Sequence, residues 1–183
     1  MSNIDIDRLT ALGRELLIAI GEDPDRAGVK DTPARFARWW KEFMDFDEGT
    51  VERVFDVGNS DEIVAVSGIK VWSLCEHHLL PFSATIAIAY KPNGVVLGLS
   101  KFGRIAHSAA HKPQVQERLT QEIADRIVSV TGSADVAVMA DGEHLCMSMR
   151  GIRTPATMTT SVMRGLFRED DRARSEVMRL WKR

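Results

Sequence analysis

The stretch Cys75-Glu76-His77-His78 carries the residue types best suited to chemistry in this sequence. A thiolate at Cys75 and an imidazole at His78, three positions apart, can bind one metal ion. His77 stands beside them and is free for proton transfer. The only other cysteine, Cys146, follows His144 by two positions. Two Cys/His clusters of this kind indicate a catalytic zinc with flanking acid and base groups.

Cys75, His78 and Cys146 together supply three ligands, which is the number that a catalytic zinc site takes from the protein. The fourth position is then open for water or substrate. A structural site would instead close the tetrahedron, and either His77 or His144 could provide the fourth ligand. A disulfide between the two cysteines is a further alternative, which a reducing compartment disfavours. The spacing predicts a metal site and leaves its form open.

The segment 143–152 is predicted to be a strand that presents the second cluster. Side chains alternate between the two faces of a strand, so one face would carry His144, Cys146, Ser148 and Arg150. The leucine and methionines between them would point into the core. An exposed strand face with one buried free cysteine is the alternative interpretation.

Ser100-Lys101-Phe102-Gly103-Arg104 is a candidate anion site. Ser100 is expected to cap a short helix, and Lys101 and Arg104 would lie on one side of its first turn. Free backbone N–H groups and the helix dipole favour a phosphate there. The alternative is a solvated basic turn, which is common.

Gln116 and Glu117 are candidates for recognising a base. A carboxylate can accept two parallel N–H bonds, as from the N1 and N2 edge of guanine, and a neighbouring amide can both donate and accept. The alternative is an ordinary exposed helix face, which spacing alone favours.

The elements that must position these groups follow from periodicity. Leucine and isoleucine at helical spacing predict a helix over about the first twenty residues, and Thr32-Pro33 predicts the start of a second. A longer helix is expected to open at Pro113 and to close at Gly132. Strands are predicted over the apolar and β-branched runs 63–72, 85–90, 95–99, 136–138, 143–152 and 157–162. This order predicts an α+β fold with an antiparallel sheet.

Composition narrows the class of protein. With 183 residues, a single domain is expected, and a hydrophobic fraction of 44% is enough for a sizeable core. The formal net charge of -2 gives no overall attraction to nucleic acid or to a membrane surface. The sequence has no apolar run of about 18 residues, so no membrane span is expected. We interpret the chain as cytoplasmic.

The sequence resembles the GTP cyclohydrolase I family. The DTPARFA stretch (31–37) is similar to the family's helical N-terminal part. The other matching pieces run in the family's order through residues 72–167 and are CEHHLLPF (75–82), IAY (88–90), GLSK (98–101), RIA (104–106), PQVQERLT (113–120), VAV (136–138), EHLCM (143–147), RGI (150–152) and GLF (165–167).

The resemblance implies the tunnelling fold, or T-fold. In such a subunit, antiparallel strands carry helices on one side. Applied to this chain, it implies one domain with a helical N-terminal part over about 1–60, a catalytic part over about 61–167 and a C-terminal helix over 168–183. It also implies a homo-oligomer, commonly a decamer of two pentamers, with active sites between subunits.

The resemblance further implies a reaction in which water adds at C8 of GTP, formate leaves and the product is 7,8-dihydroneopterin triphosphate. It implies Zn²⁺ as the cofactor, and the metal ligands would be Cys75, His78 and Cys146. The proton-transfer residues would be His77 and His144, and Ser100 would lie near the ribose. Guanine would be bound by Gln116 and Glu117. The triphosphate would be bound by Lys101, Arg104 and Arg150, and from a neighbouring subunit by Arg35 and Arg38.

Three departures from the family pattern leave these residues intact. Ala84 stands where glycine is frequent, Lys112 stands where arginine is common, and the stretch between Arg150 and Phe167 is about one residue shorter than in several relatives. One rival function is another T-fold enzyme acting on a pterin or deazapurine, but such relatives use a three-histidine metal site or a nucleophilic cysteine, and the Cys-His-Cys arrangement argues against both. The other rival is a purine-binding ring protein with a structural zinc. The implied reaction would be the first step of a folate, biopterin or 7-deazaguanine pathway.

Overall fold

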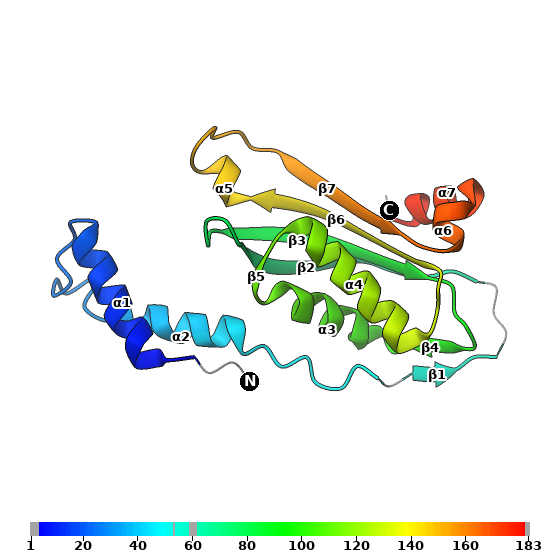
Figure 1. Ribbon diagram of the computed structural model, residues 1–183, viewed down its shortest axis with the longest axis horizontal. Coiled ribbons are helices and arrows are strands. Elements are labelled where there is room, and N and C mark those ends of the chain that lie inside the picture. The colour runs from blue at the N-terminus through cyan, green and yellow to red at the C-terminus, as the bar shows by residue number, and fades with distance from the viewer. Residues whose placement is uncertain (1–3, 53, 59–61, 182–183) are drawn as a thin grey trace. The chain divides into compact units, whose positions relative to one another are not determined.

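The computed structural model describes residues 4–52, 54–58 and 62–181 (Figure 1). By its internal contacts the chain divides into two units, one up to Phe46 and one from Asp47 onward. We describe each unit by itself.

The first unit is a pair of helices, α1 (Ile6–Ala19) and α2 (Thr32–Met44). The Asp5 side chain caps α1 by accepting a hydrogen bond of 2.9 Å from the backbone N–H of Arg8. Gly13 lets the helices approach closely, since a Cβ there would lie 3.2 Å from the Phe36 ring. Both predicted helices are confirmed, although Asp31 rather than Thr32 occupies the N-cap position of α2.

The second unit is built on a mixed sheet. Within the described residues, five strands pair in the order β5-β2-β3-β6-β7, and all the pairings are antiparallel except the parallel contact of β5 with β2. The strand bounds are β2 Val64–Cys75, β3 Pro81–Tyr90, β5 Pro113–Gln114, β6 Val136–His144 and β7 Thr157–Met163. A separate antiparallel pair joins β1 (Val54–Asp56) to β4 (Val95–Leu97).

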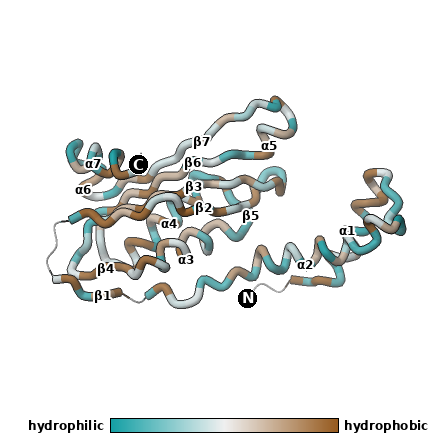
Figure 2. The backbone as a smooth tube through the Cα atoms, turned by 180° about the vertical axis from the view of Figure 1, so that it is seen from behind, coloured by the Kyte–Doolittle hydropathy of each residue, from teal (hydrophilic) through white to brown (hydrophobic). Residues whose placement is uncertain are grey.

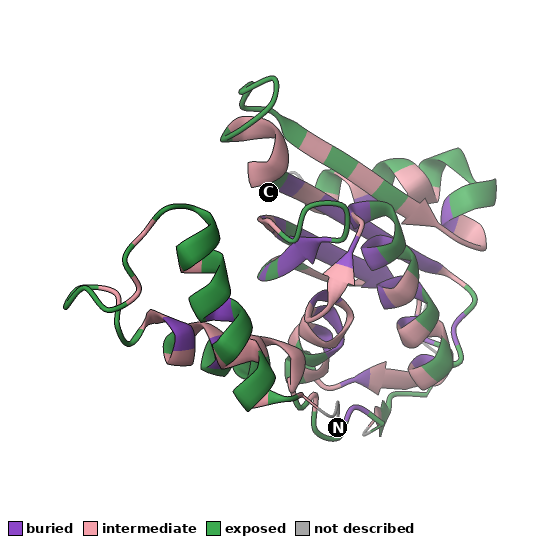
Figure 3. Cartoon of the chain, turned by 60° about the vertical axis from the view of Figure 1, so that its left-hand side comes forward, coloured by how far each residue is buried: buried purple, intermediate pink, exposed green. Residues whose placement is uncertain are grey.

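Two helices, α3 (Leu99–Ala110) and α4 (Gln116–Thr131), cover one face of the sheet (Figure 1). Hydrophobic residues follow the central strands (Figure 2), and these strands are largely buried (Figure 3). Ile86 and Ile88 of β3 belong to one core cluster with Ile105 of α3 and Ile123 of α4. Apolar burial of this extent is the main stabilising contribution to such a layer, at about 25 cal/mol per Å².

The C-terminal helices cover part of the opposite face. Phe167 of α6 (Leu166–Glu169) and Val177 of α7 (Asp171–Trp181) join a second cluster with Ala87 and Met139 of the sheet. The α+β architecture with an antiparallel sheet and covering helices, which the resemblance to T-fold subunits predicts, is confirmed. No helix in the described part of the chain combines the length and apolar character needed to cross a membrane.

One predicted strand is wrong. Over 143–152 the chain leaves the sheet at His144, and α5 (Leu145–Ser148) follows as a single helical turn. The strand pairing explains this, because β6 pairs with β7 only as far as Glu143, opposite Thr157, and with β3 only as far as His144, opposite Phe82. The side chains from 144 to 150 therefore do not alternate between two sheet faces.

Two predicted helix starts also shift. Gly98 takes the N-cap position of α3, and Ser100 lies inside its first turn without a capping hydrogen bond. Pro113 belongs to β5, and α4 begins at Gln116. The predicted end of α4 is confirmed, since Gly132 has a left-handed φ of 68°.

Candidate metal centre and active site

The turn between β2 and β3 fixes two of the predicted ligands. Cys75 ends β2, and its backbone N–H donates to the Leu80 carbonyl at 2.8 Å. The N–H groups of His78 and Leu79 donate back to the Cys75 carbonyl at 3.2 and 2.8 Å. Leu79 closes the turn with a left-handed φ of 53°. This tight loop places Nδ1 of His78 at 3.6 Å from Sγ of Cys75.

Cys146 reaches the same place from α5. The ligand atoms of Cys75, His78 and Cys146 all lie within 4.8 Å of one another. Both cysteines belong to the described part of the chain, and both are free thiols. In a tetrahedral zinc site, with Zn–S near 2.3 Å and Zn–N near 2.0 Å, neighbouring ligand atoms are about 4 Å apart. Two sulfurs and one imidazole at this spacing fit zinc.

The sulfurs also influence each other. Burial, together with the hydrogen bond and charge of Cys75, raises the pKa of the Cys146 thiol. A metal ion binds the thiolate, so metal binding has to displace a proton here.

His144 is held beside this cluster at the end of β6. Its ring stacks on Phe82, with centroids 4.5 Å apart and planes at 6°. Its Nε2 lies 2.9 Å from Oε1 of Gln116. Burial lowers the pKa of His144, and the charge of Glu117 opposes that effect. Burial therefore favours the neutral form of the imidazole.

Gln116, the first residue of α4, has an exposed fraction of only 1%. Its Nε2 donates to the carbonyls of Ala140 at 3.0 Å and Met158 at 2.9 Å, and to Oγ1 of Thr160 at 3.2 Å. All the polar atoms of this amide are engaged within the chain. Glu117, in contrast, is exposed.

Phe82 and Gly142 are site residues that the sequence did not suggest. A Cβ on Gly142 would lie 2.0 Å from Oε1 of Gln116, so only glycine leaves room for the amide. The signal in the sequence is a glycine inside a strand, which often marks the close approach of another group.

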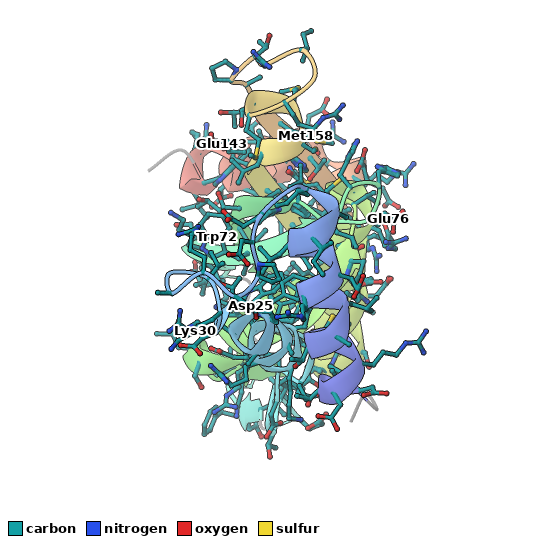
Figure 4. All side chains as sticks on the ribbon, turned by 90° about the vertical axis from the view of Figure 1, so that its left-hand side faces the viewer. Asp25, Lys30, Trp72, Glu76, Glu143 and Met158 are labelled. Atoms are coloured by element: carbon teal, nitrogen blue, oxygen red, sulfur yellow. The ribbon has the colours of Figure 1, made fainter. Side chains whose placement is uncertain are left out.

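The exposed edge of the site carries further predicted residues. His77 is exposed, with Nδ1 at 3.9 Å from Sγ of Cys75. Arg150 contacts Nε2 of His78 through NH1 at 3.0 Å, so this cation lies at the metal cluster. Glu76, which Figure 4 labels, forms an ion pair with Arg118 of α4. That pair ties the ligand turn to the helix that carries Gln116 and Glu117.

Lys101 and Arg104 line a separate pocket of about 360 Å³ together with Gly49 and Thr50. The Lys101 ammonium donates to the Thr50 carbonyl, and NH1 of Arg104 donates to the Glu48 carbonyl at 2.7 Å. Two cations around one open volume suit an anion.

This basic pocket is distant from the metal cluster within one chain. Ala110, at the end of α3, accepts a hydrogen bond of 2.7 Å from Oγ of Ser73, two residues before Cys75. Lys101 lies nine residues earlier on α3, which at 1.5 Å per residue is about 14 Å. Ser100 lies one residue before Lys101 on the same helix, farther still from Ala110.

Arg35 and Arg38 lie on α2, in the other unit. Both are exposed, and Arg35 pairs with Asp31 at 3.4 Å.

The sequence matches the family model described as GTP cyclohydrolase I over residues 9–182. It is 47% identical over 182 residues to GTP cyclohydrolase 1 of Thermoanaerobacter pseudethanolicus, an alignment that covers 97% of each chain. It is 50% identical to GTP cyclohydrolase 1 of Corynebacterium glutamicum (strain R), covering 96% of this chain and 93% of that protein. A weaker likeness links it to the crystal structure of apo archaeosine synthase QueF-Like, with a TM-score of 0.45, 16% identity, and coverage of 56% and 95% of the two chains.

Proposed function

The chain belongs to the GTP cyclohydrolase I family, and on this premise we propose that it opens the imidazole ring of GTP at a zinc centre. The products are formate and 7,8-dihydroneopterin triphosphate. We propose a cytoplasmic location for this reaction.

The observation that carries this proposal is the group formed by Cys75, His78 and Cys146. Three protein ligands leave one tetrahedral position open, as in catalytic zinc sites. A zinc ion held there would supply Lewis-acid activation of water and would lower the pKa of that water toward about 7.

The two histidines beside the metal ligands move protons. C8 of guanine becomes electrophilic when N7 is protonated, and His144 is the proposed donor there. Since burial keeps His144 neutral at rest, it has to take up a proton before it gives one. His77 is exposed to solvent beside Cys75 and can exchange protons with water during later steps.

Recognition of GTP is assigned to groups around this centre. Glu117 is exposed at the start of α4, where its carboxylate can accept the N1 and N2 hydrogens of guanine. Ser100 is the proposed ribose contact. The triphosphate is assigned to cations that match the family pattern, namely Lys101, Arg104 and Arg150, with Arg35 and Arg38.

The separation between these cations supports a site shared by two subunits. Arg150 contacts His78, whereas Lys101 is about 14 Å of helix away from the end of α3 that lies next to the ligand turn. We propose a homo-oligomer, a decamer of two pentamers, in which the basic pocket of one subunit faces the metal cluster of another.

Incubation of the purified protein with GTP tests the reaction. We expect one equivalent of formate per turnover and a product that becomes a fluorescent pterin after oxidation. Elemental analysis is expected to find one zinc per chain. A protein that binds GTP and zinc without releasing formate would instead be a purine-binding ring with a structural metal.

A further inference from the structure

We propose that Gln116 is a positioning residue: it fixes which nitrogen of His144 carries the resting proton, and it does not read the guanine ring. The expected effect of Gln116 on turnover rests on the proposed function. The expected tautomer of His144 does not depend on that function.

The orientation of the Gln116 amide follows from its neighbours. Nε2 lies within hydrogen-bond distance of the Ala140 and Met158 carbonyls, and a carbonyl can only accept. A flipped amide would place Oε1 against those two oxygens, in a buried position where unpaired acceptors are costly. The NH₂ group therefore faces the sheet, and Oε1 faces His144.

The tautomer of His144 follows in turn. Oε1 of Gln116 lies 2.9 Å from Nε2 of His144 and can only accept, so Nε2 has to carry the hydrogen. Nδ1 is then the nitrogen with a free lone pair. The same contact serves the doubly protonated ring, in which Nε2 still donates. Gln116 thus directs proton exchange to Nδ1 alone.

The ring is also prevented from turning. Phe82 stacks nearly parallel on it, with centroids 4.5 Å apart. Gly142 leaves the space that Oε1 of Gln116 occupies, since a Cβ there would lie at 2.0 Å from that oxygen. Position, plane and tautomer of the imidazole are all set by groups that bind no metal.

A reading role for Gln116 conflicts with this arrangement. Its side chain is 1% exposed, and an amide that turned to a ligand would lose its contacts with the Ala140 and Met158 carbonyls and with Oγ1 of Thr160. Glu117 stands next to it and is exposed. The two neighbours on α4 therefore have different roles: Glu117 is available to bind guanine, and Gln116 orients His144.

Steady-state kinetics of zinc-loaded Gln116→Met test this division. We expect kcat to fall about 100-fold, the scale of lost acid–base catalysis, while KM for GTP stays within about threefold. Selectivity between GTP and inosine triphosphate, which lacks the 2-amino group, should not change. The matched control is Gln114→Met, because Gln114 is also a buried amide (0% exposed) and its side chain bonds Ala109, Val115, Arg118 and Glu122 instead of His144. A retained kcat with a raised KM or a lost preference for GTP would restore the reading role and overturn the proposal.

A spectroscopic measurement of the His144 tautomer does not depend on turnover. In ¹⁵N-histidine-labelled zinc protein, the signal that disappears in His144→Ala should show a protonated Nε2 and an unprotonated Nδ1. Gln116→Met should shift that signal toward a mixture of tautomers, and Gly142→Ala, which forces Oε1 away, should do the same. A wild-type His144 protonated at Nδ1, or the same Nε2–H signal in both variants, would refute the proposal even if the protein turns over GTP. If Gln116→Met does not fold, the wild-type tautomer and Gly142→Ala decide.

Discussion

The metal cluster and the basic pocket lie toward opposite ends of α3 and are built differently. Cys75 and His78 are fixed by a hydrogen-bonded turn, and Cys146 by one helical turn after β6. Lys101 and Arg104 are long side chains whose cations are tied to carbonyls of the segment 48–50. Hydrogen-bonded backbone therefore fixes the residues of the metal cluster, whereas long, flexible side chains bring the two cations of the basic pocket together.

This difference is the basis of the proposed division of the site between subunits. One chain assembles the metal ligands, His144 and Glu117 at one end of the sheet. The same chain holds its anion pocket about 14 Å of helix away from that end. In the proposed oligomer, the pocket of a second copy would complete the site.

The largest effect is expected from removing a sulfur. Cys146→Ala should lose bound zinc and at least about 10³-fold in turnover, because two remaining ligands bind metal weakly. Elemental analysis and formate release measure both. Arg104→Ala is the matched control and should keep its zinc. Full zinc content in Cys146→Ala would place the metal elsewhere.

Mixed oligomers test the division directly. Cys146→Ala disables the metal cluster and Arg104→Ala disables the basic pocket, so subunits of both kinds, unfolded and reassembled together, should form some intact shared sites. If each site takes one half from each of two subunits, random assembly restores roughly one quarter of the sites. Activity no higher than the average of the two separate variants would show that one chain builds the whole site.

Glu117→Ala should weaken recognition of guanine and leave zinc in place. Losing hydrogen bonds to a charged group is worth about 1.5–3 kcal/mol, or about 10- to 150-fold in kcat/KM for GTP. The preference for GTP over inosine triphosphate should shrink, because the 2-amino group loses its acceptor. Gln121→Ala, on an exposed part of the same helix, is the control. Unchanged preference in Glu117→Ala would remove it from the base-binding site.

The smallest effect concerns α3, which separates the two regions. Burial lowers the pKa of His107 on this helix. The unfolded chain therefore takes up a proton near pH 6.5, before the folded chain does. The stability contributed by neutral His107 is present above pH 6.5 and is lost as pH falls through the folded pKa. Denaturant titrations between pH 7 and 5 measure the free energy of unfolding, which should fall less steeply with pH in His107→Gln than in the wild type. The same dependence on pH in both proteins would contradict this.

The sequence predicted the α+β architecture, most of the elements and the ligand group. It misjudged the segment around Cys146. Alternating polar and apolar residues fit both a strand and a short helical turn, and the choice depended on where β7 stops pairing with β6, which no local pattern reveals. The structure brings Cys75, His78 and Cys146 together all the same, because their grouping rested on residue types, spacing and family motifs and not on strand alternation; their role as ligands stays a prediction.

The sequence also grouped Gln116 with Glu117 because they are adjacent. Burial separates them, since Gln116 continues the buried stripe of α4 through Leu119, Ile123 and Ile127, whereas Glu117 falls outside it. That helical spacing was visible in the sequence. The contacts of the Glu48 and Thr50 carbonyls with Arg104 and Lys101 could not be predicted, because the irregular segment that carries these carbonyls shows no helical or strand periodicity.

Leu79 offers a starting point for engineering a hardier catalyst. Its left-handed backbone conformation costs a leucine about 1–2 kcal/mol, and asparagine adopts that conformation more readily. The side chain is 50% exposed, so little packing is sacrificed by changing it. Leu79→Asn is thus a route to greater heat tolerance that alters no ligand, and a designer could try it before any change to the core.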